Sequence, residues 1–172
     1  MSLVTGLAIL RVLYAHGVTE VGLKWPNDIL WRGRKLVGIL LEFAGEANGP
    51  CQVVCGIGIN INMPASSDIS QPWVDLQTIL GGTIPSRNQL ASDLVNELVL
   101  YYQRFERDGL LGFLDEWQRY DLCFGREIRV LQGAQALRGV ASGIDAQGAL
   151  LLELPDGRFQ ALHSGEVSVR LD

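Results

Sequence analysis

The sequence has few of the residues that build disulfide frameworks, metal sites or nucleic-acid surfaces. Its 172 residues include three cysteines and two histidines, too few for a disulfide scaffold or a zinc set. Acidic residues outnumber basic ones by 19 to 14, and the formal net charge of −5 repels phosphate on average. We therefore expect no metal ligands, no nucleic-acid partner, and thiols that stay reduced in a cytoplasmic protein.

Long apolar runs are also missing. No stretch reaches the roughly 18 consecutive apolar residues that a membrane-spanning helix needs. The first ten residues have no basic segment and no small-residue cleavage pattern, which is unlike a secretory signal peptide. The sequence thus predicts no membrane partner and a cytoplasmic location.

The short motifs of covalent catalysis and nucleotide binding are absent. We find no Ser-His-Asp order, no phosphate-binding loop ending in Gly-Lys-Ser/Thr, and no complete Rossmann fingerprint. Gly56 and Gly58 supply only two glycines of such a fingerprint, and no helix is predicted directly after them. What remains is a concentration of polar residues and glycines between Lys24 and Trp73, set among apolar strands.

Composition and the apolar pattern favour an α/β or α+β protein that begins with a helix and several strands. Leu3, Leu7 and Leu10 at helical spacing indicate an amphipathic helix over residues 2–15. The strand expected at 52–60 is almost entirely apolar before Asn60, which favours a central place in the sheet. Strands are expected at 18–23, 29–31, 35–43 and 52–60, with a rigid polar loop at 24–28 and a tight turn at 32–34.

Two helices and a small barrel complete the predicted fold. Ser86 and Gln89 form a capping box, and the helix they begin ends at Gly109. A second helix buries Phe113 and Trp117. Five short strands separated by turn signals then follow in about fifty residues, which predicts a small closed barrel. We place the domain boundary so that the domains are residues 1–122 and 123–172.

Lys24 and Lys35 are the two lysines beside the predicted sheet. A reaction that develops negative charge on phosphoryl oxygens needs fixed cations, and lysine supplies a compact one. The alternative is that both are solvated charges at hairpin ends. Lys35 precedes an apolar strand, and an orientation along the sheet face would bring it toward the glycines of that strand and the next.

Glycines and two polar or aromatic residues suggest a ligand surface on this sheet. Gly38, Gly56 and Gly58 would form a flat floor for a planar apolar ligand, whereas the alternative is that they mark local bulges. Asn60 offers an amide group at the end of a strand, and Trp73 could stack on a base. The alternative for Trp73 is a packing residue.

Four motifs in order resemble the catalytic part of biotin protein ligases, also called biotin--[acetyl-CoA-carboxylase] ligases. Two segments of the C-terminal part are similar to the SH3-like barrel of that family. The resemblance implies a class II synthetase-like mixed sheet with helices, N-terminally truncated and followed by an SH3-like barrel. The segments are KWPND at 24–28, RKLVGILLE at 34–42, GIGININ at 56–62, PWVDLQ at 72–77, GIDAQGALLLE at 143–153 and GEVSVR at 165–170.

The resemblance implies a two-step reaction. The biotin carboxylate attacks the α-phosphate of ATP, assisted by Mg²⁺, to give biotinyl-5′-AMP and pyrophosphate. A lysine of the biotin carboxyl carrier domain of acetyl-CoA carboxylase then attacks the mixed anhydride and releases AMP. No protein nucleophile takes part, so catalysis consists of positioning and charge stabilisation.

Residue roles follow from the same resemblance. Lys35 is similar to the lysine that contacts the biotin carboxylate and the α-phosphate, and Lys24 to a lysine near the phosphates. Glu166 matches a position linked to carrier-domain contact. The biotin floor and wall would consist of Lys35, Gly38, Leu40, Gly56 and Gly58, and the nucleotide contacts of Lys24, Asn27, Asp28, Asn60, Trp73 and Arg170.

Two segments of the family have no counterpart in this sequence: the GRGRxG loop that closes over biotin, and the winged-helix domain of bifunctional members. We therefore expect a partial catalytic domain with impaired activity, and no DNA binding. The turn at Arg32-Gly33-Arg34 follows KWPND instead of preceding it, so we assign it no catalytic role. The alternatives are a catalytically silent module that binds biotin, a carrier domain or a second copy of itself as a homodimer, and a relative of lipoate ligases.

Overall fold

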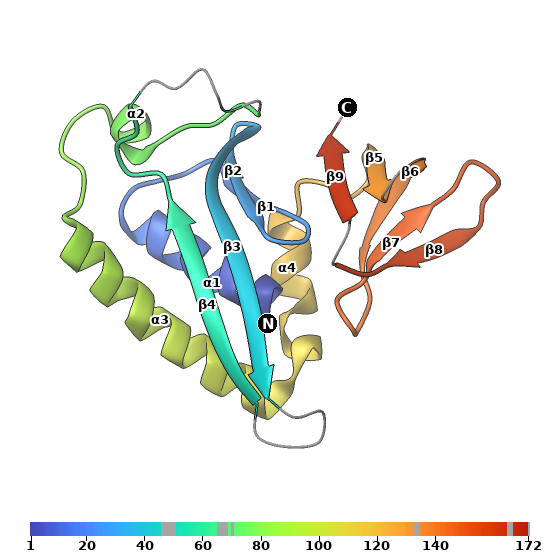
Figure 1. Cartoon of the computed structure of the whole chain (residues 1–172), viewed down its shortest axis with the longest axis horizontal. Coiled ribbons are helices and arrows are strands. Elements are labelled where there is room, and N and C mark those ends of the chain that lie inside the picture. The colour runs from blue at the N-terminus through green and yellow to red at the C-terminus, as the bar shows by residue number, and fades with distance from the viewer. Residues whose placement is uncertain (46–50, 65–68, 70, 133–134, 165–166, 172) are drawn as a thin grey trace.

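Two antiparallel sheets organise the fold of the computed structural model, which describes residues 1–45, 51–64, 69, 71–132, 135–164 and 167–171 (Figure 1). The strand orders are β1-β2-β3-β4 and β8-β7-β6-β5-β9. The predicted α+β organisation is confirmed, but the expected mixed sheet is not: every ladder between the described strands of the first sheet is antiparallel. The elements are α1 Ser2–Ala15, β1 Val21–Lys24, β2 Asp28–Trp31, β3 Arg34–Gly45, β4 Cys51–Ile59, α2 Leu76–Leu80, α3 Arg87–Asp108, the 3₁₀ helix η1 Leu110–Phe113, α4 Leu114–Tyr120, β5 Glu127–Gln132, β6 Gln135–Ile144, β7 Leu150–Glu153, β8 Phe159–Leu162 and β9 Val167–Leu171.

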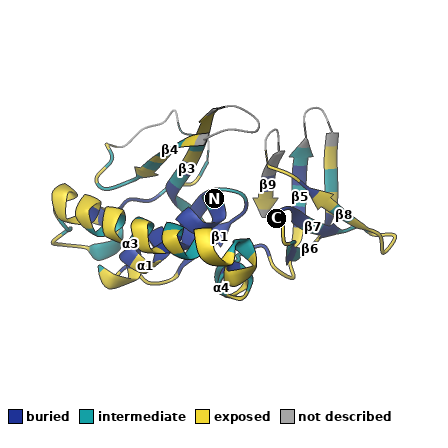
Figure 2. Cartoon of the chain, turned by 90° about the horizontal axis from the view of Figure 1, so that it is seen from below, coloured by how far each residue is buried: buried dark blue, intermediate teal, exposed yellow. Residues whose placement is uncertain are grey.

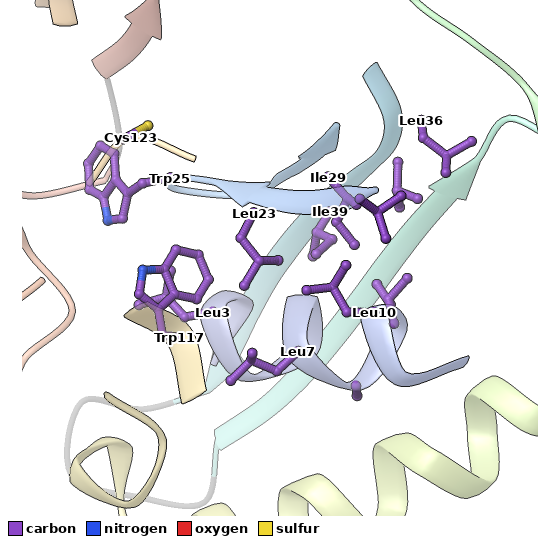
Figure 3. Packing of buried hydrophobic residues seen from close by; sticks show 14 of the residues in the cluster. Leu3, Leu7, Leu10, Leu23, Trp25, Ile29, Leu36, Ile39, Trp117 and Cys123 are labelled. Atoms are coloured by element: carbon purple, nitrogen blue, oxygen red, sulfur yellow. The ribbon is translucent and has the colours of Figure 1, made fainter. Parts of the chain in front are cut away.

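The first helix is central to the core. From Leu3 to Leu13, every residue of α1 except Arg11 is buried. The expectation of an amphipathic helix was therefore wrong, because α1 is covered by the first sheet on one side and packs against α3 and α4 on others. Figure 3 shows Leu7 and Leu10 of α1 in the same cluster as Leu23 of β1.

Two tight hairpins build the first sheet. Lys24 closes β1 and pairs directly with Asp28, the first residue of β2, so the predicted polar loop is shorter than expected. The first strand begins at residue 21 instead of 18. Arg32 and Gly33 connect β2 to β3 with φ angles of 46° and 78°, the left-handed pair of a type I′ turn. The predicted turn at 32–34 is confirmed.

The fourth strand lies at an edge of the first sheet, and the central position predicted for it was wrong. Its side chains alternate, with Ile57 and Ile59 half-buried toward the helices and Val54 60% exposed on the other face. Gly56 and Gly58 occupy that outer face. Because glycine does not interrupt an apolar run, the sequence hides this alternation. Figure 2 shows α1 and α3 on one side of β3 and β4.

The predicted helix ends are confirmed. The Ser86 hydroxyl accepts a hydrogen bond from the Gln89 backbone N–H at 3.1 Å, and Gly109 ends α3 with a φ of 63°. Phe113 and Trp117 are buried, as expected. In the described part of the chain, no helix combines the length and the apolar character that crossing a membrane requires.

Two neighbouring tyrosines of α3 bind partners on other elements. The Tyr102 hydroxyl lies 2.8 Å from the Thr5 hydroxyl of α1, and the Tyr101 hydroxyl donates to a Glu116 carboxylate oxygen at 2.6 Å. Burial is the largest cause that raises the pKa of Tyr102, to about 12, and burial together with Glu116 raises the pKa of Tyr101 further. Both phenols are therefore held in their neutral form by the fold.

We expect the unfolding free energy to fall as the pH rises from about 10 to about 12, because the unfolded chain releases these phenolic protons first. Below pH 10 both states keep the protons and this contribution is fully present. Tyr102→Phe should flatten the decline, as measured by urea unfolding at pH 9, 10 and 11. Tyr120→Phe is the control for loss of a hydroxyl. Parallel declines in the two variants would contradict the assignment.

The second sheet contains the five short strands expected in the last fifty residues of the sequence. The described pairings place β8 and β9 at its two edges, and no ladder joins these two strands among residues 127–132, 135–164 and 167–171. The expectation of fully closed strand pairing is therefore not met. β7 and β8 have only four residues each, and such short strands offer few backbone groups for a further ladder.

The second sheet is attached to the first by backbone and side-chain hydrogen bonds. The Leu122 N–H donates to the Leu23 carbonyl at 2.9 Å. The indole N–H of Trp25, in the turn after β1, donates to the Gly148 carbonyl at 3.0 Å. Figure 3 shows Cys123 beside the Trp25 indole. The turn that carries Lys24 and Asp28 is thus fixed to both halves of the chain.

Candidate functional site

Asp28 holds two lysine side chains at the start of β2. The Lys24 ammonium lies 2.9 Å from Oδ2 and the Lys35 ammonium lies 2.6 Å from Oδ1 of this carboxylate. Lys35 reaches Asp28 because the β2–β3 register shifts between Ile29 and Leu30, leaving an extra residue, Leu36, in β3. Such a bulge turns a side chain to the other face, and it places Lys35 over the same face as Gly38.

The three charges differ in how far solvent reaches them. The Lys35 side chain is 28% exposed, compared with 11% for Lys24 and 10% for Asp28. Two ammonium groups share one carboxylate, so the cluster has an excess of positive charge. A ligand approaching from solvent therefore meets Lys35 first, while Lys24 stabilises the buried carboxylate from behind.

Glycines line a hollow beside Lys35. Gly38 pairs with Gly58, and Leu40 pairs with Gly56, on the face that the helices leave uncovered. A Cβ atom on Gly38 would lie 3.2 Å from the Lys35 ammonium, so a side chain there would displace it. The hollow has a volume of about 500 Å³ and is lined by Asn27, Lys35, Gly38, Ile39, Leu40, Gly56, Ile57 and Gly58.

A second hollow lies on the other side of Lys35. Its volume is about 350 Å³, and it is bordered by residues of the first sheet, of the segment after β4 and of β9. Lys24, Lys35 and Arg170 contribute cations to its wall. Lys35 lines both hollows, so one lysine joins an uncharged floor to a basic pocket.

The amide side chains are used by the backbone. The Asn27 amide donates to the Ile39 carbonyl at 2.7 Å, and the Asn60 amide donates to the Lys35 and Val74 carbonyls at 3.2 and 3.1 Å. Asn60 thus joins the segment after β4 to β3, directly at Lys35. Half-buried Trp73 forms a β-bridge with Lys35 and lines neither hollow.

The described residues provide no resident metal site. In the parts of the chain that the structure describes, no group of three or more His, Cys, Asp or Glu side chains could hold a metal ion. Asp28, the carboxylate beside Gly38, has each oxygen on a lysine. These residues do not fit a protein-bound Mg²⁺. Glu166, predicted to contact a carrier domain, lies outside the described residues.

A larger hollow of about 590 Å³ lies between α1, α3 and α4, and none of the predicted site residues lines it.

Sequence reasoning missed two features of the site itself. One is the bulge at Leu36, whose signal is that Leu36 and Val37 are consecutive apolar residues in an alternating strand. The other is the hydrogen bond from Trp25 to Gly148, 123 residues away, which leaves no sequence signal.

Comparisons with known proteins agree with the motifs. Residues 1–60 match the Biotin/lipoate A/B protein ligase family, and residues 123–170 match the Biotin protein ligase C terminal domain. The chain is 39% identical over 172 residues to the Bifunctional ligase/repressor BirA of Escherichia coli, covering 99% of this chain and 53% of that protein. It is 32% identical over 174 residues to the Biotin--[acetyl-CoA-carboxylase] ligase of Paracoccus denitrificans, covering 97% and 71%.

A solved structure shares the fold over nearly the whole chain. The biotin protein ligase from Aquifex aeolicus in complex with biotin and ATP superposes with a TM-score of 0.86 at 25% identity, covering 99% of this chain and 71% of that one. The chain spans about half the length of the BirA relative.

Proposed function

The chain belongs to the biotin protein ligase family, and from this premise we propose that it takes part in ATP-dependent activation of biotin to biotinyl-5′-AMP and transfer to a lysine of a carrier protein. The observation that carries the proposal is Lys35, which is anchored by Asp28 and lines both the glycine floor and the basic pocket. The relative from Aquifex aeolicus, solved with biotin and ATP, supports this choice of ligands.

The proposed chemistry brings two anions together. The biotin carboxylate and the α-phosphate of ATP repel each other, and a fixed cation between them lowers that barrier. Lys35 lines both hollows and is the most exposed of the three charged groups, which suits it to this role. Lys24 acts by holding Asp28, and therefore Lys35, in position. Because biotin itself attacks the phosphate, the protein supplies orientation and charge and no nucleophile.

Biotin would lie on the floor of Gly38, Gly56 and Gly58, with Leu40 at its wall. ATP would place its phosphates in the basic pocket beside Lys24 and Arg170. Mg²⁺ would enter this scheme with ATP as the counter-ion of its phosphates, because both oxygens of Asp28 are bonded to lysines. Trp73 would stack on the adenine, and Asn60 would contact the adenylate through its carbonyl oxygen, because its amide nitrogen donates to two backbone carbonyls.

We assign residues 1–122 to the catalytic part and 123–172 to the SH3-like barrel, and the carrier domain of acetyl-CoA carboxylase as the acceptor. A cytoplasmic location fits this acceptor.

Self-association is a second candidate, favoured by β4, whose outer edge is unpaired in the described sheet. Light scattering that shows a monomer at high concentration would contradict it. A preference for lipoate over biotin would favour the lipoate ligase alternative.

Lys35→Ala tests the central cation. We expect the affinity for biotinyl-5′-AMP to fall about 100-fold or more, with little change in melting temperature, because the side chain is partly exposed and its loss leaves Asp28 paired with Lys24. Calorimetric titration of biotin and of biotinyl-5′-AMP measures both affinities.

Arg34→Ala is the matched control, since Arg34 neighbours Lys35 on β3 and stacks on Trp31 outside the site. It should leave both affinities unchanged. The proposed function fails if the folded wild-type chain binds neither ligand, and the role of Lys35 fails if Lys35→Ala binds as tightly as wild type.

A further inference from the structure

Three arginines stand side by side across the second sheet. Arg138 on β6 is paired directly with Arg129 on β5, and Arg129 is paired directly with Arg170 on β9. Residues in direct cross-strand register project from the same face of a sheet. Because neighbouring strands lie about 4.8 Å apart, the three Cα atoms span about 10 Å. We call this row the arginine strip.

The three arginines of the strip are not paired with a carboxylate in the described residues, although Glu127, two residues before Arg129 on β5, projects from the same face. Among the residues that the structure describes, none of these three arginines forms an ion pair or a side-chain hydrogen bond. The Nε–H of Arg129 is buried without an acceptor among them. Like charges in direct register destabilise a sheet, and a buried donor without an acceptor adds a desolvation cost. In a chain of net charge −5, this local excess of positive charge calls for an external anion.

The strip is continuous with the basic pocket. Arg170 is the end of the strip on β9 and also lines the hollow of about 350 Å³ that holds Lys24 and Lys35. Cations therefore extend from that pocket across three strands of the barrel. A hollow of this size admits a small ligand and excludes the surface of a folded protein, which argues against an acidic protein as the occupant.

We propose that Arg138, Arg129 and Arg170 bind a chain of linked phosphoryl groups. This inference rests on the proposed function, because it continues the pocket assigned to the phosphates of ATP. Guanidinium groups bind phosphate oxygens in pairs, and a row of them suits a ligand that carries several oxyanions in succession. Two sources share this chemistry: the β- and γ-phosphates of bound nucleotide, and inorganic pyrophosphate.

Arg138→Gln is the decisive variant, because Arg138 is exposed and its loss should not disturb folding. We expect it to weaken binding of sodium tripolyphosphate about tenfold in calorimetric titration, with Arg138→Lys retaining part of the affinity. Arg158→Gln is the matched control: it removes one positive charge from an exposed turn of the same barrel, where Arg158 pairs with Asp156. It should change the affinity less than twofold.

Nucleotide titrations separate the two sources. If the strip binds the phosphates of ATP, tripolyphosphate and ATP compete, and Arg138→Gln weakens ATP but not AMP. If the strip instead binds inorganic pyrophosphate at a place that ATP leaves free, tripolyphosphate should still bind when the chain is saturated with ATP. Equal tripolyphosphate affinity in wild type and Arg138→Gln overturns the proposal, as does Arg138-dependent binding of duplex DNA without binding of tripolyphosphate. If the chain binds tripolyphosphate through Arg138 but binds neither biotin nor ATP, the proposed role of the arginine strip stands and the proposed function fails.

Discussion

Asp28→Asn will lower the free energy of unfolding by about 3–5 kcal/mol, the usual cost of breaking a buried ion pair by removing one partner. The Asp28 side chain is only 10% exposed and is bonded to two ammonium groups. With an amide in its place, Lys24 would remain 11% exposed without a counter-ion, and two cations would face each other. Urea unfolding at pH 7 measures the loss.

Two further variants isolate the cause. Asp156→Asn removes an exposed carboxylate that also pairs with an arginine, and it should leave the stability unchanged because solvent screens that pair. Adding Lys24→Met to Asp28→Asn removes the unpaired charge, so the double variant should be more stable than Asp28→Asn alone. If the double variant is less stable, the loss in Asp28→Asn has another cause.

The cations and the floor of the site were predictable because they lie close together along the chain. Four ordered motifs correctly predicted the family, and the two-residue turn at Arg32 and Gly33 fixed the hairpin that brings Lys35 beside Asp28. Asn60 is different. Its amide binds the carbonyls of Lys35 and Val74, and a pairing between segments so far apart is set by tertiary packing.

The errors in the fold have the same origin. The sequence of α1 contains the apolar residues of a helix stripe, but whether the remaining faces are covered depends on α3 and α4, which lie far along the chain. The position of β4 in the sheet depends on which strands pair with it, and an apolar run does not encode that. Local patterns therefore located the elements, whereas their neighbours had to come from the structure.

Gly148→Ala will weaken the contact between the two halves of the chain, because Gly148, in the turn before β7, packs against Leu3 of α1 and Leu110 of η1. Its φ is +82°, and a Cβ atom would lie 3.0 Å from Leu3 and 3.1 Å from Leu110. Its carbonyl also accepts the Trp25 hydrogen bond. Left-handed strain of about 1–2 kcal/mol and overpacking of about 1–3 kcal/mol should together lower the stability by about 2–5 kcal/mol.

Gly157→Ala is the matched control for backbone strain. Gly157 has nearly the same φ, +81°, in another turn of the barrel, but nothing lies within 4 Å of its added Cβ. This variant should lose only the strain of about 1–2 kcal/mol. The difference between the two variants in urea unfolding therefore measures the packing of the 145–149 turn against α1 and η1.

The reactivity of the Cys123 thiol reports whether the contact between the barrel and the catalytic part opens. Cys123 is buried beside Trp25, and burial raises the pKa of its thiol to about 12, so it should react with a thiol reagent at pH 8 only when the joint opens (Figure 3). In a background with Ser at positions 51 and 55, Gly148→Ala should accelerate this reaction about tenfold or more, and Gly157→Ala should not. Because Arg170 reaches the lysine pocket from the barrel, opening the joint should also weaken ATP binding. Equal thiol rates in the two variants would show that the turn at Gly148 does not hold the barrel in place.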